Sequence, residues 1–270
     1  TAVCDDGIVI DLSAMRAVRV NPVDRSAWVQ GGALWGDVDH ETQAHGLATT
    51  GGIVSHTGVA GLTLGGGVGW LMRKHGLTVD NLLAVDVVTA DGELLRASED
   101  EHPDLFWALR GGGGNFGVVT SFEFRLHSVG PTVLAGPILW DATDAGEILR
   151  FYRDFVRDAP DELGTVVRFG TAPPLPVIPE DLHWRPVVIV ASCYAGPIDE
   201  AEEVLRPLRA FGVPVLDLVG PTPYVGFQSA IDSTVIHGWN YYWKSTHLPE
   251  LRNDLIDVIT EHALDRKSTR

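Results

Sequence analysis

In the first half of the chain, apolar and polar residues alternate over short stretches of the kind that form half-buried strands. Two short helices are predicted among them: Trp35–His45 stops before Gly46, a typical C-terminal residue, and Pro103–Arg110 begins with a proline that suits a first helical turn. The predicted strands are Ile8–Leu12, Ala17–Val20, Ala27–Gln30, Leu82–Thr89, Glu93–Arg96 and Val118–Leu126.

The second half carries longer amphipathic segments. Apolar residues recur at helical spacing in Ile148–Phe155, Ile198–Leu208 and Leu248–Ile259. Strand-like segments, Pro186–Ala191 and Asn240–Lys244, lie between them. No glycine-rich phosphate loop follows either segment, so we expect an antiparallel sheet covered by helices. The whole pattern predicts an α+β fold.

The distribution of glycine and proline divides the chain. Most glycines lie in residues 31–130 and most prolines in residues 131–270. We therefore expect a domain boundary near Gly130-Pro131, which gives one domain over 1–130 and another over 131–270.

Composition narrows the possible functions. The chain has 270 residues and a net charge of −16, and such an acidic surface argues against nucleic acid as a partner. No apolar run approaches the ~18 residues that a membrane span needs. Two cysteines, Cys4 and Cys193, are too few for a disulfide framework. No signal peptide is visible, which favours a cytoplasmic location, although an N-terminal signal could lie upstream of Thr1.

Two motifs resemble known sites but lack the structural context that those sites need. Gly112–Gly117 satisfies G-x-G-x-x-G, yet the dinucleotide fingerprint follows a strand and opens a helix, and here a helix precedes and a strand follows. His40 and His45 are five residues apart, which points their rings about 140° apart on a helix. Neither a Rossmann site nor a metal site is predicted.

The most informative stretch is Thr50–Trp70, where glycines alternate with Val, Ala, Leu, Ile and Trp. Flexible linkers carry polar spacers instead, so this segment is expected to be buried or in close contact with something. Two interpretations stay open. The glycines permit tight packing of the protein on itself, or they let backbone amides approach an anionic, nucleotide-type cofactor.

Three ordered blocks, Gly65–Leu77, Asp80–Gly92 and Asp104–Val119, resemble the berberine-bridge-enzyme-like FAD-linked oxidases of the vanillyl-alcohol-oxidase superfamily. The resemblance implies a PCMH-type FAD-binding domain over 1–130 and a substrate-binding domain over 131–270, both partial. It also implies FAD as cofactor, with any covalent His link upstream of residue 1 and a C-terminal segment beyond Arg270. On this basis we expect a central fragment that is inactive by itself.

The resemblance further assigns residues. Leu62 stands where many plant-type members have a flavin-contacting His, and Val54 stands where bicovalent members have a second linking Cys, so neither role carries over. The segment along the pyrophosphate and isoalloxazine corresponds to Gly51, Gly52, Thr57, Gly58, Gly61, Gly65 and Gly66, and the adenosine end to Gly117 and Val119, mainly through backbone atoms.

The implied activity is hydride transfer from an alcohol, sugar or phenolic substrate to flavin N5, with reoxidation by O2. Tyr241, Tyr242 and Lys244 are the visible candidates for the substrate side, and substrate contact is favoured over catalysis because aromatic strand residues usually pack. Two alternatives stay open: an inactive flavin-fold remnant that binds a ligand, and a nicotinamide-dependent reductase, for which no motif is present.

Overall fold

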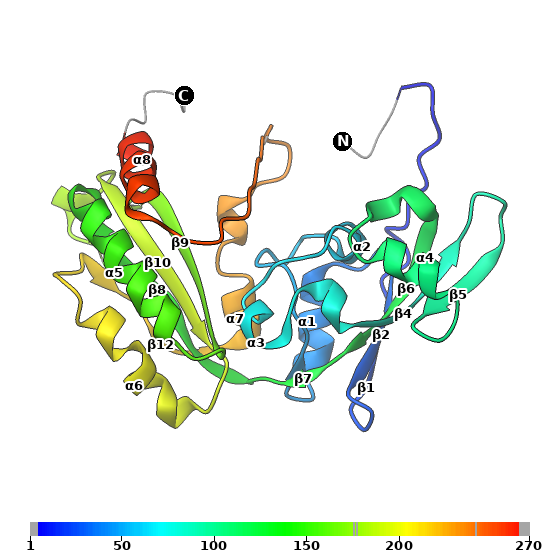
Figure 1. Cartoon of the computed structure of the whole chain (residues 1–270). Coiled ribbons are helices and arrows are strands. Elements are labelled where there is room, and N and C mark those ends of the chain that lie inside the picture. Colours follow the sequence, from blue (N-terminus) through cyan, green and yellow to red (C-terminus); the bar gives the residue numbers. More distant parts are fainter. Residues whose placement is uncertain (1–4, 175, 177, 241, 265–270) are drawn as a thin grey trace. The chain divides into compact units, whose positions relative to one another are not determined.

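The computed structural model describes residues 5–174, 176, 178–240 and 242–264. The chain forms two compact units, each with its own sheet (Figure 1). Unit 1 comprises Thr1–Thr132 and Pro223–Ile236, and unit 2 comprises Val133–Thr222 and His237–Arg270. A single boundary near Gly130-Pro131 therefore does not describe the return of Pro223–Ile236 to unit 1.

Unit 1 is built on a five-stranded antiparallel sheet with the order β1-β2-β6-β4-β5. In β2, Ala27 and Val29 are fully buried, while the residues between them are partly exposed. This alternation follows because successive side chains of a strand point to opposite faces. The strands are β1 (Val18–Asn21), β2 (Ser26–Gln30), β4 (Leu82–Val88), β5 (Leu94–Ser98) and β6 (Val118–Arg125).

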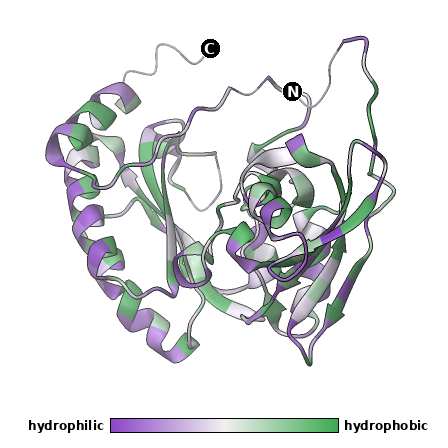
Figure 2. Ribbon diagram, turned by 45° about the vertical axis from the view of Figure 1, so that its right-hand side comes forward, coloured by the Kyte–Doolittle hydropathy of each residue, from purple (hydrophilic) through white to green (hydrophobic). Residues whose placement is uncertain are grey.

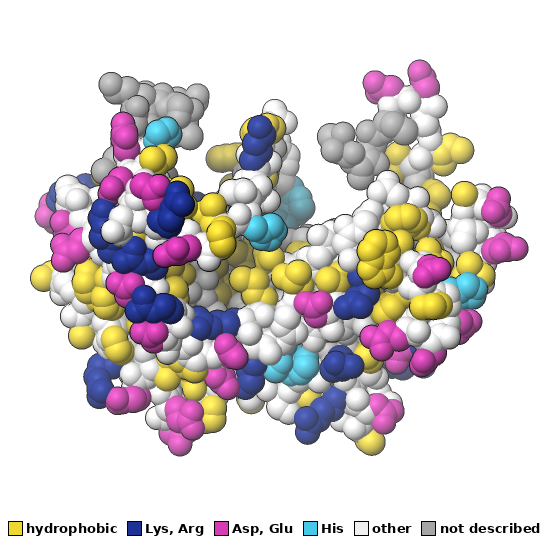
Figure 3. Space-filling view, viewed as in Figure 1, with side chains coloured by type: hydrophobic (Ala, Val, Ile, Leu, Met, Phe, Trp, Pro, Cys, Tyr) yellow, Lys and Arg dark blue, Asp and Glu magenta, His cyan; other side chains and the backbone are white. Residues whose placement is uncertain are grey.

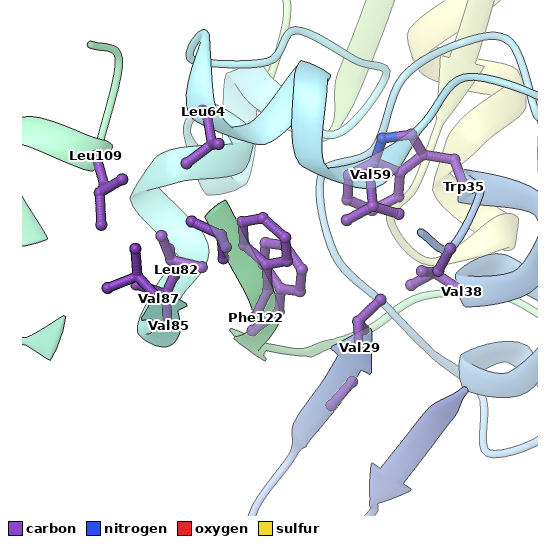
Figure 4. Close-up of a cluster of buried hydrophobic side chains, with 14 of the residues drawn as sticks. Val29, Trp35, Val38, Val59, Leu64, Leu82, Val85, Val87, Leu109 and Phe122 are labelled. Carbon is purple, nitrogen blue, oxygen red and sulfur yellow. The ribbon is translucent and has the colours of Figure 1, made fainter. Parts of the chain in front are cut away.

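Short helices complete the core of unit 1. Trp35 of α1, Val59 of α2 and Leu109 of α4 join Phe122 of β6 in one buried cluster (Figure 4). The other described elements of this unit are α1 (Trp35–Gln43), β3 (Leu47–Ala48), α2 (Val59–Leu64), α3 (Met72–His75), η1 (Thr78–Asn81), α4 (Pro103–Leu109), η2 (Gly113–Phe116), β7 (His127–Ser128), α7 (Tyr224–Gln228) and η5 (Asp232–Thr234).

Unit 2 has an antiparallel sheet with the order β11-β8-β10-β9, and β12 also pairs with β8. Ile148 of α5 and Leu205 of α6 lie in the same buried cluster as Val188 of β10. Both helices are amphipathic, and Figure 2 shows apolar and polar residues interspersed along them. The elements are β8 (Thr132–Asp141), η3 (Ala142–Asp144), α5 (Ala145–Asp158), β9 (Leu163–Thr171), η4 (Glu180–Leu182), β10 (Pro186–Tyr194), α6 (Ile198–Arg209), β11 (Leu216–Asp217), β12 (Gly220–Pro223) and α8 (Asn253–Leu264).

The predicted α+β fold is confirmed, and so is the antiparallel sheet with helices in the second half. Three local predictions are wrong. Ile8–Leu12 is not a strand, and Ile8 is 91% exposed, because no described strand pairs with it. Residues 240 and 242–244 form no strand either. Leu248 and Leu251 precede α8, which begins at Asn253.

None of the helices in the described part of the chain has the length and apolar character that crossing a membrane requires.

Candidate functional site

A bare strip of backbone runs along helix α2 in unit 1. Gly58, Gly61 and Gly65 are exposed, and their spacing of three and four residues places them on one side of the helix. A Cβ atom built on Gly58, Gly61 or Gly66 would meet no described heavy atom within 4 Å. Over this part of unit 1, the surface in Figure 3 is mainly white, the colour shared by the backbone and uncharged polar side chains, with yellow hydrophobic side chains beside it. The strip therefore admits a large group against the main chain.

Other glycines of the same stretch are required by internal packing. A Cβ on Gly51 would lie 2.5 Å from the Trp35 ring, and one on Gly52 would lie 2.6 Å from Leu62 Cδ1. A Cβ on Gly69 would lie 1.9 Å from the Gly51 carbonyl oxygen. The tight-packing interpretation thus holds for Gly51, Gly52 and Gly69, and cofactor contact stays a prediction for the glycines with open Cβ positions. Contact of Gly51 and Gly52 with a cofactor stays a prediction, and only their backbone atoms could make it.

The second predicted contact region lies at the start of β6. Gly117 has a φ of +144°, and a Cβ there would lie 2.5 Å from the Val88 carbonyl oxygen. Val119 is 3% exposed and belongs to the core, so its side chain is committed to packing. Any contact of these residues with a cofactor has to use the main chain, as predicted.

Two glycines that the sequence reasoning did not select lie beside the strip. The Gly111 amide donates to the Leu64 carbonyl at 3.1 Å, which joins the start of the Gly111–Gly114 run to the end of α2. Gly111 and Gly114 are exposed, and a Cβ on either would meet no described heavy atom within 4 Å. The glycine run lies in the block Asp104–Val119 that carries the family resemblance, and this run is the sequence signal for Gly111 and Gly114.

Several buried polar atoms around the stretch have no hydrogen-bond partner among the described residues. They are Trp35 Nε1, Thr49 Oγ1, Thr63 Oγ1 and Trp70 Nε1. Buried polar groups are normally satisfied, and three of these four atoms belong to residues 49–70, so this segment can take up polar partners. Together with the open strip, these atoms fit a large polar cofactor.

The loop from Gly76 to Val79 holds the stretch in place from one side. The Thr50 hydroxyl donates to the Gly76 carbonyl at 2.9 Å, and the Thr78 hydroxyl donates to the Thr50 carbonyl at 2.8 Å. The Thr78 and Val79 amides donate to the Gly67 and Gly66 carbonyls, both at 3.0 Å. The backbone at Gly66 is thereby fixed although no side chain fills the space in front of it.

The predicted substrate residues lie in unit 2 and are not brought together on a strand. Tyr241 lies outside the described residues. Tyr242 is 83% exposed, and Lys244 Nζ lies 5.8 Å from the centre of its ring. The prediction of a strand over Asn240–Lys244 therefore fails at Tyr242 and Lys244, because aromatic content alone does not form a strand without a pairing partner. Among the described residues, no cluster of His, Cys, Asp or Glu could hold a metal ion.

Two titratable groups of unit 1 are strongly perturbed. Burial raises the pKa of Asp39, which is 2% exposed, to about 7, although a hydrogen bond from Gln228 opposes the change. Burial lowers the pKa of His127 to about 4, and the charges of His75, Arg125 and Lys74 act in the same direction. Neither residue was selected from the sequence, which shows nothing of burial.

His127 supports the loop that fixes Gly66. Its ring stacks on His75 with centroids 3.7 Å apart, and its Nε2 lies 2.6 Å from Asn81 Oδ1. The Asn81 side-chain amide donates in turn to the His75 and Leu77 carbonyls, both at 2.9 Å. The neutral imidazole, which donates from Nε2, is the form that this arrangement stabilises.

We expect the free energy of unfolding to fall as the pH falls from about 6.5 to about 4, because an unfolded His127 binds a proton that the folded ring resists. The ring is half-buried, so solvent screening limits the effect to about 1 kcal/mol. His127→Gln keeps a donor toward Asn81 and should lose less stability over this range in urea titrations. His40→Gln, at an exposed position of α1, is the control. A His127→Gln variant that loses as much stability as the wild type would contradict the expectation.

Comparisons with known proteins give one family match and many relatives. Residues 1–98 match the family model described as "FAD binding domain". An FAD-linked oxidoreductase of Dictyostelium discoideum is 34% identical over 96% of this chain and 54% of its own length. The (R)-6-hydroxynicotine oxidase of Paenarthrobacter nicotinovorans is 36% identical over 82% of this chain and 46% of its own length. The chain spans about half the length of these curated relatives.

Solved structures give the same result. The xylooligosaccharide oxidase of Myceliophthora thermophila C1, in complex with xylobiose, has a TM-score of 0.76 and 25% identity, and the match covers 97% of this chain and 56% of that one. The BBE-like #28 protein of Arabidopsis thaliana has a TM-score of 0.68 and 28% identity, and the match covers 82% of this chain and 44% of that one.

Proposed function

This chain belongs to the berberine-bridge-enzyme-like FAD-linked oxidases, and on that premise we propose that the protein oxidises a small alcohol, sugar or phenol with O2 as the final electron acceptor. The substrate loses two electrons and two protons, and O2 becomes H2O2. The observation that carries the proposal is the bare strip of Gly58, Gly61 and Gly65, which the open Cβ position of Gly66 continues, in a glycine-rich stretch with unsatisfied buried polar atoms.

FAD, when bound, supplies a two-electron acceptor for the hydride that leaves the substrate carbon. The chain's contribution is to bind and orient it. Gly58, Gly61 and Gly66 leave the main chain uncovered, so the cofactor can approach the backbone closely. The hydrogen bonds from Thr50 and Thr78 keep that surface in a fixed shape before the cofactor binds. A preformed site lowers the ordering cost of binding.

The substrate side of the proposal rests on accessible groups of unit 2. Tyr242 is 83% exposed and Lys244 also presents its side chain to solvent, so both are available for contact with a hydroxylated or aromatic substrate. Tyr241 stays a candidate from the sequence. The relatives support a small organic substrate, since one is a hydroxynicotine oxidase and another structure holds xylobiose. No catalytic base is assigned.

The test is a visible spectrum of the purified full-length protein, followed by oxygen-consumption assays with xylobiose, glucose, simple phenols and 6-hydroxynicotine. We expect a bound flavin spectrum and O2 uptake with at least one member of the panel. A protein that binds FAD and consumes no O2 while its flavin is reduced by a substrate would show a dehydrogenase instead of an oxidase. A folded protein that takes up no FAD would contradict the proposal.

We expect no flavin–cysteine bond to form at position 54 or at Cys193, the cysteine that lies within the described residues. Val54 has no thiol with which to form such a bond. Cys193 is fully buried in unit 2, and burial raises the pKa of its thiol to about 12, so the reactive thiolate does not form. Mass spectrometry of tryptic peptides from the flavin-loaded protein is the measurement. A flavin adduct on a peptide that contains Cys193 would contradict this expectation.

A further inference from the structure

The segment Pro223–Ile236 belongs to unit 1, although the residues before and after it belong to unit 2. It contacts both ends of the glycine-rich stretch Thr50–Trp70. At the far end, the Phe227 and Trp70 rings lie 4.8 Å apart at 47°. At the near end, the Gln228 side-chain amide donates to the Gly52 carbonyl at 3.4 Å and to Asp39 at 3.1 Å. Gln228 and Trp70 are both buried, so these contacts are shielded from water.

Asp232 makes the most specific of these contacts. One carboxylate oxygen accepts the Ser55 amide at 2.9 Å, and the other accepts the Ser55 hydroxyl at 2.5 Å. Both bonds are charge-assisted, and such bonds are about twice as strong as neutral ones. A single carboxylate thus fixes both the main chain and the side chain of one residue of the stretch.

The turn that Asp232 holds leads directly into the bare strip. The turn comprises residues 55–57, and α1 binds two of its carbonyl groups. The Gly36 amide donates to the Ser55 carbonyl at 2.8 Å, and the Trp35 amide donates to the Thr57 carbonyl at 3.0 Å. Asp232 accepts from the amide and the hydroxyl of Ser55 in the same turn. Gly58 follows immediately and precedes α2. A shift of Ser55 would therefore move the start of the strip.

We propose that Asp232 is a positioning residue for FAD, which acts through Ser55 to hold the turn before Gly58 in the conformation that the cofactor needs. This inference rests on the proposed role of the strip in cofactor binding. It assigns a cofactor function to a residue that lies 177 positions away from Ser55 in the sequence. It also makes FAD affinity depend on a segment whose two ends continue into unit 2.

The experiment measures the FAD concentration that half-saturates the intact apoprotein, prepared under riboflavin limitation, by quenching of flavin fluorescence. We expect Asp232→Ala to raise this concentration about tenfold, because it removes both charge-assisted hydrogen bonds to Ser55 and acts on FAD only through the turn. Ser55→Ala removes only the hydroxyl bond and should raise it less. Asp232→Asn keeps one acceptor and should lie between the wild type and Asp232→Ala.

Asp141→Ala is the matched control. Asp141 accepts the Thr143 amide at 3.0 Å and the Thr143 hydroxyl at 2.9 Å, so the substitution removes the same kind of contact in unit 2. It should lower the thermal midpoint and leave the half-saturating FAD concentration unchanged. If Asp232→Ala does not fold, Ser55→Ala and Asp232→Asn decide the question.

Wild-type FAD affinity in the Asp232 and Ser55 variants would overturn the inference, as would an equal loss of affinity in Asp141→Ala. Gly61→Leu distinguishes an error in the cofactor site from an error in the positioning role of Asp232. If Gly61→Leu binds FAD weakly while Asp232→Ala binds normally, the strip is the cofactor site and only the positioning role is wrong. If Gly61→Leu binds FAD normally, the proposed site itself is wrong.

Discussion

Replacing Gly61 by leucine should weaken FAD binding about a hundredfold and leave the protein at least as stable as before. Gly61 lies in the interior of α2, is exposed, and has no described heavy atom within 4 Å of its Cβ position. Glycine is about 1 kcal/mol less favourable than alanine inside a helix, so the substitution removes a conformational cost. A leucine there would occupy the space in front of the strip, and steric exclusion of about 3 kcal/mol weakens binding about a hundredfold.

Two further glycines make this test specific. Gly66→Leu should also weaken binding, but its φ of +114° adds backbone strain. Gly92 has a φ of +79° and an equally open Cβ position in the β4–β5 turn, so Gly92→Leu carries comparable strain away from the strip. The measurements are flavin absorbance per mole of protein and the thermal midpoint. Full flavin occupancy in Gly61→Leu would contradict the assignment of the strip, whatever its stability.

The regular elements of unit 1 could be predicted because local patterns specify them. β4 and β6 lie within two residues of their predicted bounds, and α4 begins at Pro103 as expected. Ile8–Leu12 shows the limit of this reasoning. It is at least as apolar as β2, yet a strand also needs a neighbour for its hydrogen bonds, and the sequence pattern does not supply that information.

The site could be predicted only in part. Glycine content identified the stretch from Thr50 to Trp70, but it could not separate Gly61, which faces open space, from Gly51, which packs on Trp35. That difference depends on the fold around each residue. The contact between Asp232 and Ser55 joins residues 177 positions apart, and nothing local in either segment indicates it.

The buried carboxyl of Asp39 should make the protein less stable as the pH rises from about 4 to about 7. Its pKa is raised from 3.8 to about 7, so the folded state holds a proton that the unfolded state releases. The stabilising contribution is complete below the unfolded pKa and is lost as the pH rises through the folded one. At about 1.36 kcal/mol per pH unit, the whole effect is of the order of 4 kcal/mol.

Asp39→Asn should remove this dependence. The protonated carboxyl suits its surroundings, because Gln228 Nε2 donates to Asp39 and Gln228 Oε1 has no partner among the described residues. An asparagine amide presents the same donor and acceptor to Gln228, and it never ionises. In urea titrations, the variant should gain stability relative to the wild type as the pH rises from about 4 to about 7. Glu41→Gln, at an exposed position of the same helix, should show no such gain.

A constant difference between Asp39→Asn and the wild type would mean that Asp39 does not titrate in this range. The carboxylate would then be charged in the core at neutral pH, with Gln228 as its compensating donor.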